Sequence, residues 1–474
     1  MKRRYFFLLL LLLIIAALLI WFFCRGRNDV AGIIPEDARA VAALDVKELS
    51  QATGLAVDKL CSKLGVAEVG QSGLNLSAPV YGFVSRQGHF GIALSVKSKR
   101  RVKKALQQIG TDVESQRGLQ WAMVKSWIFA FDSDRLLVMG PASSSEVGSL
   151  RGQMTALMNQ KKVSSPTLND LNKRSGTLKL ISRMDVMPKT YVQMLKKWLP
   201  AGIDFNSVSA FAALDAQKKS FTLHTELLSE DKQVLNSFAQ IDSLLRPIQG
   251  SLLDQGHSSP VLWVTAGLKG DRLLTLLRQN STIRTQLIAL NMCVDADMML
   301  RSIDGDVSLS VPSISLGFKL PSALLTAKLS NKDFLHNVDS WKTGLATDAG
   351  VRFRVLRDND FHLSAGNVNA FFGVRGDQLY ITSDARLAEQ ACRPVSTPSL
   401  QGLLPQMKNQ VFFATFDASA FMKSLGLLAQ LLSSDSSIMK AVNAIERINL
   451  SASNSHDISL EVQCNRDLAD FITP

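Results

Sequence analysis

The sequence predicts an α+β protein in which an N-terminal transmembrane helix precedes two tandem repeats, each an antiparallel sheet with helices packed on one face. Three observations predict this arrangement: an uncharged apolar segment near the start, strands that come mostly as neighbouring hairpins followed by helices, and an order of elements that recurs. The 474 residues are 46% hydrophobic and 20% charged. Such a composition can bury real cores and excludes disordered, collagen-like and disulfide-scaffold classes.

Residues 5–24 form the predicted membrane anchor. They contain no charge and no proline, and at about 1.5 Å per residue a helix of this length extends about 30 Å, the thickness of the hydrocarbon core of a bilayer. Trp21, Phe22 and Phe23 are bulky where a signal peptidase requires small side chains, so we expect the anchor to be retained. Phe23 also argues against acylation of Cys24.

The charges around the anchor predict its orientation. More positive charge precedes residues 5–24 than follows them, which favours a cytoplasmic N-terminus. A long domain after a span is translocated largely regardless of its charge, so the bulk of the chain is expected outside the cytoplasm, in the periplasm. The basic flanks that complete this anchor region, 1–27, are Lys2, Arg3, Arg4, Arg25 and Arg27.

The rest of the chain divides into two halves in which five groups of elements recur in the same order. We expect repeat one at 28–246, a Gly-, Ser- and Pro-containing linker at 247–260, and repeat two at 261–474. The clearest correspondence is between two hairpins with acidic turns, one at 119–150 and the other at 361–390. Their turns read Asp132-Ser133-Asp134-Arg135 and Arg375-Gly376-Asp377-Gln378.

Two short phrases of the sequence carry a recognisable pattern. The first is AGIIPEDARAVAALDVKELSQATGL at 31–55, with a proline, an acidic residue and a small residue before an apolar strand that ends in Asp and a helix. The second is IDGDVSLSVP at 303–312. Both resemble phrases of an uncharacterised bacterial cell-envelope family, a domain of unknown function best known from Bacteroidetes. The resemblance covers the chain from about residue 30 onward and implies an envelope location. Many members look like lipoproteins, and Phe23 before Cys24 departs from that pattern. The family resemblance implies no catalytic residues.

The motifs of known catalytic sites are missing from the sequence. There is no HExxH, no His/Cys spacing for zinc, no GxSxG, no Walker loop and no GxGxxG after a predicted strand, so we predict no catalytic, cofactor or metal site. His362 follows Asp358 and Asp360, which offers a carboxylate–imidazole pair or, as we favour, a polar turn before a strand. Asp185 and Asp417 are expected to cap helices.

Three carboxylate pairs and four cysteines could in principle carry further chemistry. The carboxylate pairs are Asp132/Asp134, Asp295/Asp297 and Asp304/Asp306. We expect Asp295/Asp297 to cap a helix and Asp304/Asp306 to form a turn. The cysteines allow three disulfide pairings in an oxidising compartment, and unpaired buried thiols are the interpretation we favour. They are Cys61, Cys293, Cys392 and Cys464.

One segment concentrates positive charge. The chain has 53 Lys and Arg against 41 Asp and Glu; removing the five basic residues of the anchor region leaves 48 against 41, an excess of 7. This small excess gives no support to nucleic-acid binding. Nearly all of it lies on a predicted amphipathic helix, which we interpret as a contact for anionic lipid or a polyanionic glycan, or as a solvated surface. Its cations are Lys97, Lys99, Arg100, Arg101, Lys103 and Lys104.

The sequence therefore predicts a membrane-anchored envelope protein that acts without catalysis, as a binding or assembly component with an envelope protein partner. A lipid- or glycolipid-binding protein is the alternative, in which the basic helix meets the membrane. A hydrolase that brings carboxylates together only in the fold is the third class.

Overall fold

The computed structural model describes residues 29–54, 57, 72–160, 166–187, 190, 192–193, 204–254, 259–291, 294–314, 322–344, 351–366, 368–395, 397–425 and 443–471. Among these residues no helix has both the length and the apolar character needed to cross a membrane. The predicted anchor at 5–24 and Cys24 lie outside the described residues. The chain forms two compact units: unit 1 comprises Met1–Leu235 with Arg466–Pro474, and unit 2 comprises Asn236–Asn465.

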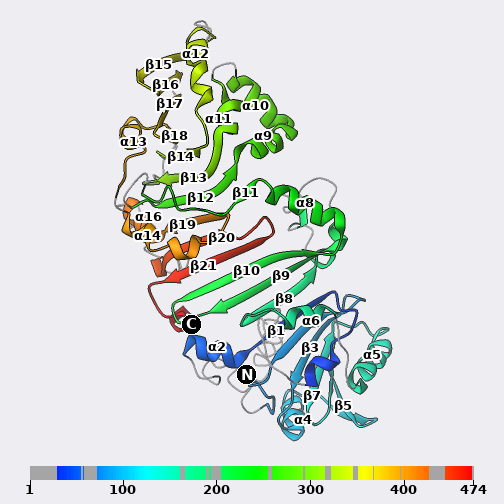
Figure 1. Cartoon of the computed structure of the whole chain (residues 1–474). Helices are drawn as coiled ribbons and strands as arrows, with labels where there is room; N and C mark the ends of the chain where they lie inside the picture. Colours follow the sequence, from blue (N-terminus) through cyan, green and yellow to red (C-terminus); the bar gives the residue numbers. More distant parts are fainter. Residues whose placement is uncertain are drawn as a thin grey trace. The chain divides into compact units, whose positions relative to one another are not determined.

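Unit 1 contains ten described strands in which every neighbouring pair is antiparallel. Their order across the sheet is β4-β5-β6-β7-β3-β2-β1-β8-β9-β10 (Figure 1). Their bounds are β1 (Ala40–Leu44), β2 (Val80–Val84), β3 (Phe90–Ser95), β4 (Val113–Gln116), β5 (Leu119–Val124), β6 (Trp127–Phe131), β7 (Arg135–Gly140), β8 (Leu178–Arg183), β9 (Val208–Ala216) and β10 (Ser220–Ser229).

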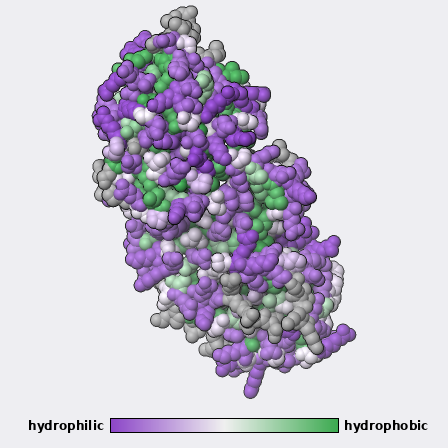
Figure 2. Space-filling view, in the orientation of Figure 1, coloured by the Kyte–Doolittle hydropathy of each residue, from purple (hydrophilic) through white to green (hydrophobic). Residues whose placement is uncertain are grey.

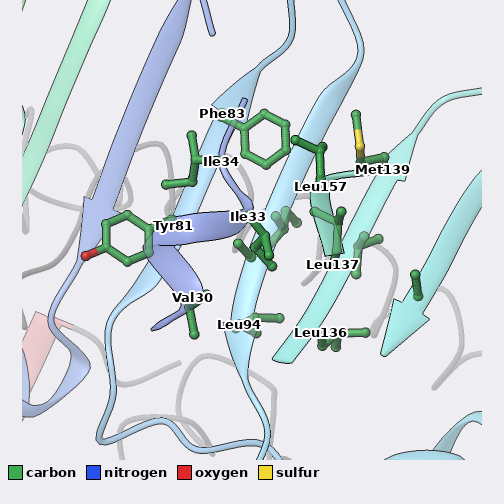
Figure 3. Packing of buried hydrophobic residues seen from close by; sticks show 14 of the residues in the cluster. Val30, Ile33, Ile34, Tyr81, Phe83, Leu94, Leu136, Leu137, Met139 and Leu157 are labelled. Carbon is green, nitrogen blue, oxygen red and sulfur yellow. The ribbon is translucent and has the colours of Figure 1, made fainter. Parts of the chain in front are cut away.

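Most helices of unit 1 follow strands in the chain, and several pack against the sheet. Figure 3 shows Ile33 of the first short helix and the next residue, Ile34, among apolar side chains that include Phe83 and Leu137, all of them buried. The helices are η1 (Asp29–Ile33), α2 (Val46–Thr53), α4 (Lys99–Gln108), α5 (Val147–Asn159), α6 (Pro166–Asn172), η3 (Met184–Val186), η4 (Phe205–Ser207), α8 (Lys232–Asp242), which runs past the end of the unit, and α19 (Leu468–Phe471).

Part of this sheet is buried on both faces. Successive side chains of a strand point to opposite faces, yet the four consecutive residues 128–131 of β6 are all buried. Both faces are therefore covered there. α5 packs against β6 and β7, while Val102 and Leu106 of α4 belong to the same apolar core.

The described part of unit 2 contains eleven strands. Ten of them lie in the order β15-β16-β17-β18-β14-β13-β12-β19-β20-β21, again antiparallel throughout, and the short β11 (Leu245–Arg246) also pairs with β12. Their bounds are β12 (Leu262–Lys269), β13 (Ile303–Val311), β14 (Leu324–Leu329), β15 (Val351–Arg357), β16 (Asp360–Ala365), β17 (Val368–Arg375), β18 (Gln378–Thr382), β19 (Phe412–Asp417), β20 (Ile445–Ala452) and β21 (Asp457–Cys464).

The helices of unit 2 occupy the same places in chain order as those of unit 1. One apolar cluster joins Trp341 to the aromatic side chains Phe353, Phe361 and Phe372 of β15–β17. The helices are α9 (Gly270–Gln279), α10 (Ser281–Asn291), α11 (Ala296–Ser302), η5 (Asp333–Asn337), α12 (Val338–Gly344), α13 (Ala385–Gln390), α14 (Pro398–Gln401), α15 (Leu404–Met407) and α16 (Ala418–Leu425).

The two units have one strand order. The strands correspond in chain order, β1 with β12, β2 with β13, and so on to β10 with β21. Corresponding strands have corresponding neighbours in the two sheets. In both, the fourth to seventh strands form a meander of hairpins, and the first strand lies between the second and the eighth.

Two boundaries differ from the sequence-based expectation. The predicted linker at 247–260 packs into unit 2 where it is described, because Ile248 and Leu253 are buried in a cluster with Trp263 and Phe413. The last residues, 466–474, group with unit 1, and the N–H of Leu468 donates to the carbonyl oxygen of Lys218 at 2.8 Å. The apolar side chains of Ile248 and Leu253 therefore hold the first of these segments to unit 2.

Candidate functional site

The basic helix α4 follows β3 and is fixed to unit 1 by its apolar side. Val102 and Leu106, four residues apart and so on one helical face, are 4% and 7% exposed. The predicted amphipathic helix is thus confirmed. Its cations stand at the edges and on the outer side: Lys97, Arg100, Arg101 and Lys104 are exposed, and Lys99 and Lys103 are half-buried.

No acidic side chain neutralises these cations within the described part of the chain. None of the six forms an ion pair there, and the first turn of α4 contains no acidic residue. Cations at a helix N-terminus oppose the helix dipole, each at a cost of about 0.3–1 kcal/mol. Lys99, Arg100 and Arg101 all lie in that turn. This arrangement does not serve the stability of α4.

A glycine holds the start of α4 in place. The carbonyl oxygen of Gly73 accepts hydrogen bonds from the N–H groups of Lys97 and Ser98, at 2.8 and 3.0 Å. Gly73 has φ +82°, and a Cβ there would lie 2.5 Å from the carbonyl oxygen of Ser98 and 2.6 Å from Cβ of Arg101. Only glycine permits this approach. The loop and the helix therefore form one rigid support for the positive charges.

The carboxylate pairs are engaged in structural contacts. Oδ1 of Asp295 accepts from the N–H of Met298 at 3.0 Å, which confirms the predicted cap of α11, and Asp297 pairs with Arg278. Oδ2 of Asp132 accepts from Nη2 of Arg135 at 2.9 Å.

The segment Asp304-Gly305-Asp306 is not a turn, as predicted from its composition, but an irregular stretch inside β13 with Gly305 at φ +146°. Asp306 is 1% exposed and accepts from the N–H groups of Gln249 and Ser251, at 2.9 and 2.8 Å. Asp304 pairs with Arg246 at 2.6 Å. The glycine supplies the left-handed backbone that lets the strand bulge without breaking.

Of the two aspartates predicted to cap helices, one does. Oδ1 of Asp417 accepts from the N–H of Ala420 at 2.7 Å, at the start of α16. Asp185 lies inside η3 instead, where it faces Arg183 at 3.4 Å and Arg39 at 3.9 Å. The neighbouring cations offer this carboxylate better partners than the short helix does.

Among the described residues, His362 pairs with no carboxylate. Its Nε2 lies 3.0 Å from Oδ1 of Asn369, and its ring stacks on Phe371. Asp360 is directed elsewhere: Oδ2 accepts from Nη2 of Arg375 at 2.8 Å and Oδ1 from the hydroxyl of Tyr380 at 2.9 Å. Burial, followed by the hydrogen bond to this carboxylate, raises the pKa of Tyr380 well above its usual range.

The buried Asp360–Arg375–Tyr380 contacts were not predicted from the sequence, because their members come from three different strands. The sequence-based expectation also missed the arginines of β15, VRFRVLR, whose alternation is typical of a strand with one polar face. Of the cysteines, Cys392 and Cys464 carry free thiols, while Cys61 and Cys293 lie outside the described residues. Within the described residues no three His, Cys, Asp or Glu side chains gather as metal ligands would.

The chain is thus a mixed helix and antiparallel-sheet protein whose basic helix forms no ion pair with a described acidic residue. It belongs to the family of the domain of unknown function DUF4836, whose model matches residues 59–425. This confirms the predicted membership of a family of unknown function.

Among solved structures, crystal form IV of TP0453 is similar at 13% identity, covering 46% of this chain and 85% of that one with a TM-score of 0.28. Crystal form III of TP0453 is similar at 14% identity, covering 47% of this chain and 88% of that one with a TM-score of 0.29. No curated protein matches the chain.

Proposed function

We propose that the chain is a membrane-anchored envelope protein, a non-catalytic binding or assembly component, and that α4 is its contact for an anionic partner. The observation that carries the proposal is the set of six cations, five on α4 and Lys97 just before it, that no described acidic side chain neutralises. Where a sequence keeps charges that destabilise its own helix, function is the expected reason.

The anchor brings these cations to a membrane. Only residues 25–29 separate the apolar segment 5–24 from Val30, which is buried in the same core as Val102 and Leu106. Such a connection extends at most about 20 Å. Unit 1 would therefore be held next to the bilayer, where anionic head groups attract each nearby Lys or Arg by about 1 kcal/mol.

The carboxylates support a role without catalysis. Asp132, Asp295, Asp306 and Asp417 each bind backbone N–H groups or a neighbouring cation, and such carboxylates are poor candidates for acid and base groups across an open cleft. We infer in addition that the two units arose by duplication of one ten-stranded unit, since they share a single strand order.

The test compares two charge reversals in the full-length protein. Cells would carry Arg100→Glu with Arg101→Glu, or the matched control Arg284→Glu with Lys408→Glu, which reverses two exposed charges of unit 2. After in-cell cross-linking, the purified protein and its companions would be identified by mass spectrometry. We expect recovery of the main cross-linked companion to fall at least about tenfold in the α4 variant and to be unchanged in the control. Equal recovery from both variants would contradict the proposal.

A lipid- or glycolipid-binding role is the second candidate, and exposed apolar side chains favour it. Leu276 of α9 and Ile288 and Leu290 of α10 are 41%, 59% and 47% exposed. In the view of Figure 2, hydrophilic residues cover most of the visible face and hydrophobic residues form scattered groups among them. Recovery of a lipid in place of a protein companion in the same experiment would select this role.

A further inference from the structure

We propose that the outer face of β15, β16 and β17 in unit 2 binds an acidic oligosaccharide. The strand register places Arg354 opposite His362 and His362 opposite Phe371. Two residues along the same strands, it places Arg352 opposite Ser364. Residues opposite one another in antiparallel strands share a face. One face therefore carries Arg352, Arg354, His362, Ser364, Asn369 and Phe371.

The centre of this face is a preformed aromatic platform. The rings of His362 and Phe371 stack with centroids 4.4 Å apart and an interplanar angle of 9°. The contact of His362 Nε2 with Asn369 Oδ1, at 3.0 Å, fixes the imidazole. Phe371 is held from its other side by a buried cluster that includes Tyr380 and Leu387. The platform is thus ordered before any ligand arrives.

Two arginines flank the platform. Arg352 and Arg354 are exposed and form no ion pair with any described acidic residue. Alternate residues of a strand lie about 7 Å apart, and three strands span about 10 Å, which matches a few sugar rings. Arginine binds carboxylates through two parallel hydrogen bonds, Asn369 and Ser364 can bind hydroxyl groups, and the flat rings can pack against the apolar face of a sugar.

The corresponding part of unit 1 is closed. There the helix after the hairpin, α5, has 13 residues, and Arg151 lies 5.5 Å from the ring centroid of Trp121 and 3.3 Å from Glu114 of β4. In unit 2 the helix at this place, α13, has 6 residues and packs against β17 and β18. In unit 1, β5 and β6 are therefore almost wholly buried, whereas in unit 2 Arg352 and Arg354 of β15 are exposed and His362, Ser364 and Phe371 are half-buried.

The test is a titration of the full chain, in discs of zwitterionic lipid, with tetragalacturonate and with neutral maltotetraose. We expect the uronate alone to bind and to shift the imidazole nitrogen resonances of His362. Arg352→Gln with Arg354→Gln should weaken binding at least about tenfold, since it removes two charged partners of carboxylates. The matched control, Arg284→Gln with Lys408→Gln at two exposed positions of unit 2, should change affinity less than about twofold.

Several outcomes would overturn the site. One is equal weakening by the β15 variant and the Arg284/Lys408 control, which would indicate attraction by net charge. Another is tighter binding of oligothymidylate than of the uronate, because that would make the platform a nucleic-acid surface. Arginines on an edge strand can also serve to block strand addition; self-association of the β15 variant with unchanged uronate affinity would assign them that role instead. Failure of the α4 cross-linking test would leave this titration unaffected.

Discussion

Arg135 of β7 donates a hydrogen bond from Nη2 to the carbonyl oxygen of Met158 at 2.9 Å, in the last turn of α5. Unit 2 makes the same kind of contact with an arginine from the other strand of its hairpin: Nη1 of Arg375 donates to the carbonyl oxygen of Ala391 at 2.8 Å, at the end of α13. The last carbonyls of a helix lack partners within it, and a cation there also suits the helix dipole. Both units therefore fasten a helix to its preceding hairpin through arginine.

Replacing this arginine in unit 1 should loosen α5. Arg135→Gln removes the contact with Met158 and the ion pair with Asp132, and we expect the free energy of unfolding of unit 1 to fall by about 1–3 kcal/mol. Urea unfolding, with hydrogen exchange read on peptides of α5, measures the effect. The control is Arg86→Gln, an exposed arginine, which should change stability by less than about 0.5 kcal/mol. Equal losses in the two variants would argue against the contact.

The two acids of the β13 bulge provide a matched pair. Asp306→Asn leaves buried N–H groups of Gln249 and Ser251 facing an amide, so unit 2 should lose about 2–3 kcal/mol of stability. Asp304→Asn removes only a largely solvated ion pair with Arg246 and should cost less than about 1 kcal/mol. Denaturant midpoints compare them, and a larger effect at Asp304 would show that the buried contacts are not the important ones.

Alanine substitutions at two glycines near opposite ends of α4 should distinguish the cost of backbone strain from the cost of a steric clash. Gly73 and Gly110 have nearly the same φ, +82° and +83°, but a Cβ at Gly110 meets no atom within 4 Å. Gly110→Ala should therefore cost about 1 kcal/mol from its conformation alone. Gly73→Ala should cost clearly more, because Ser98 and the helix must move, and it should weaken whatever α4 binds. Thermal unfolding with the cross-linking assay above tests both parts, and equal costs would contradict the supporting role of Gly73.

The thiol of Cys392 should react slowly at neutral pH. Burial raises the pKa of this thiol to about 11, and only the thiolate is nucleophilic. At pH 8 the thiolate fraction of Cys392 is therefore roughly one hundredth of that of a thiol with pKa 9.0. Because the pKa in the folded state is the higher one, this group's contribution to stability is present at neutral pH and is lost as the pH rises through about 11.

Peptide-resolved labelling with iodoacetamide measures this prediction. The rate at Cys392 should rise about tenfold per pH unit up to about pH 11 in the folded chain. In urea the same peptide should react as an ordinary thiol does. Fast labelling of folded Cys392 at pH 8 would mean that the thiol is not shielded as described.

Local signals in the sequence predicted local structure well. The strands and the amphipathic helix between residues 80 and 108, the two caps at Asp295 and Asp417, and the paired hairpin turns all follow from periodicity and turn chemistry within short windows. What could not be predicted depends on distant partners. The burial of Asp306 against the 249–251 segment, and the position of the C-terminal residues with unit 1, follow from contacts far apart in sequence.

The single strand order of the two units has a consequence for folding. A chain that carries two versions of one sheet plan risks inserting a strand into the wrong copy while it folds, a characteristic failure of repeated domains. The copies differ where such an exchange would matter: β6 has 5 residues and β17 has 8. The arginine that fastens the following helix also comes from opposite strands, as Arg135 and Arg375 show. A misplaced hairpin would leave strand residues unpaired and a helix end unfastened, so these differences direct each strand to its own sheet.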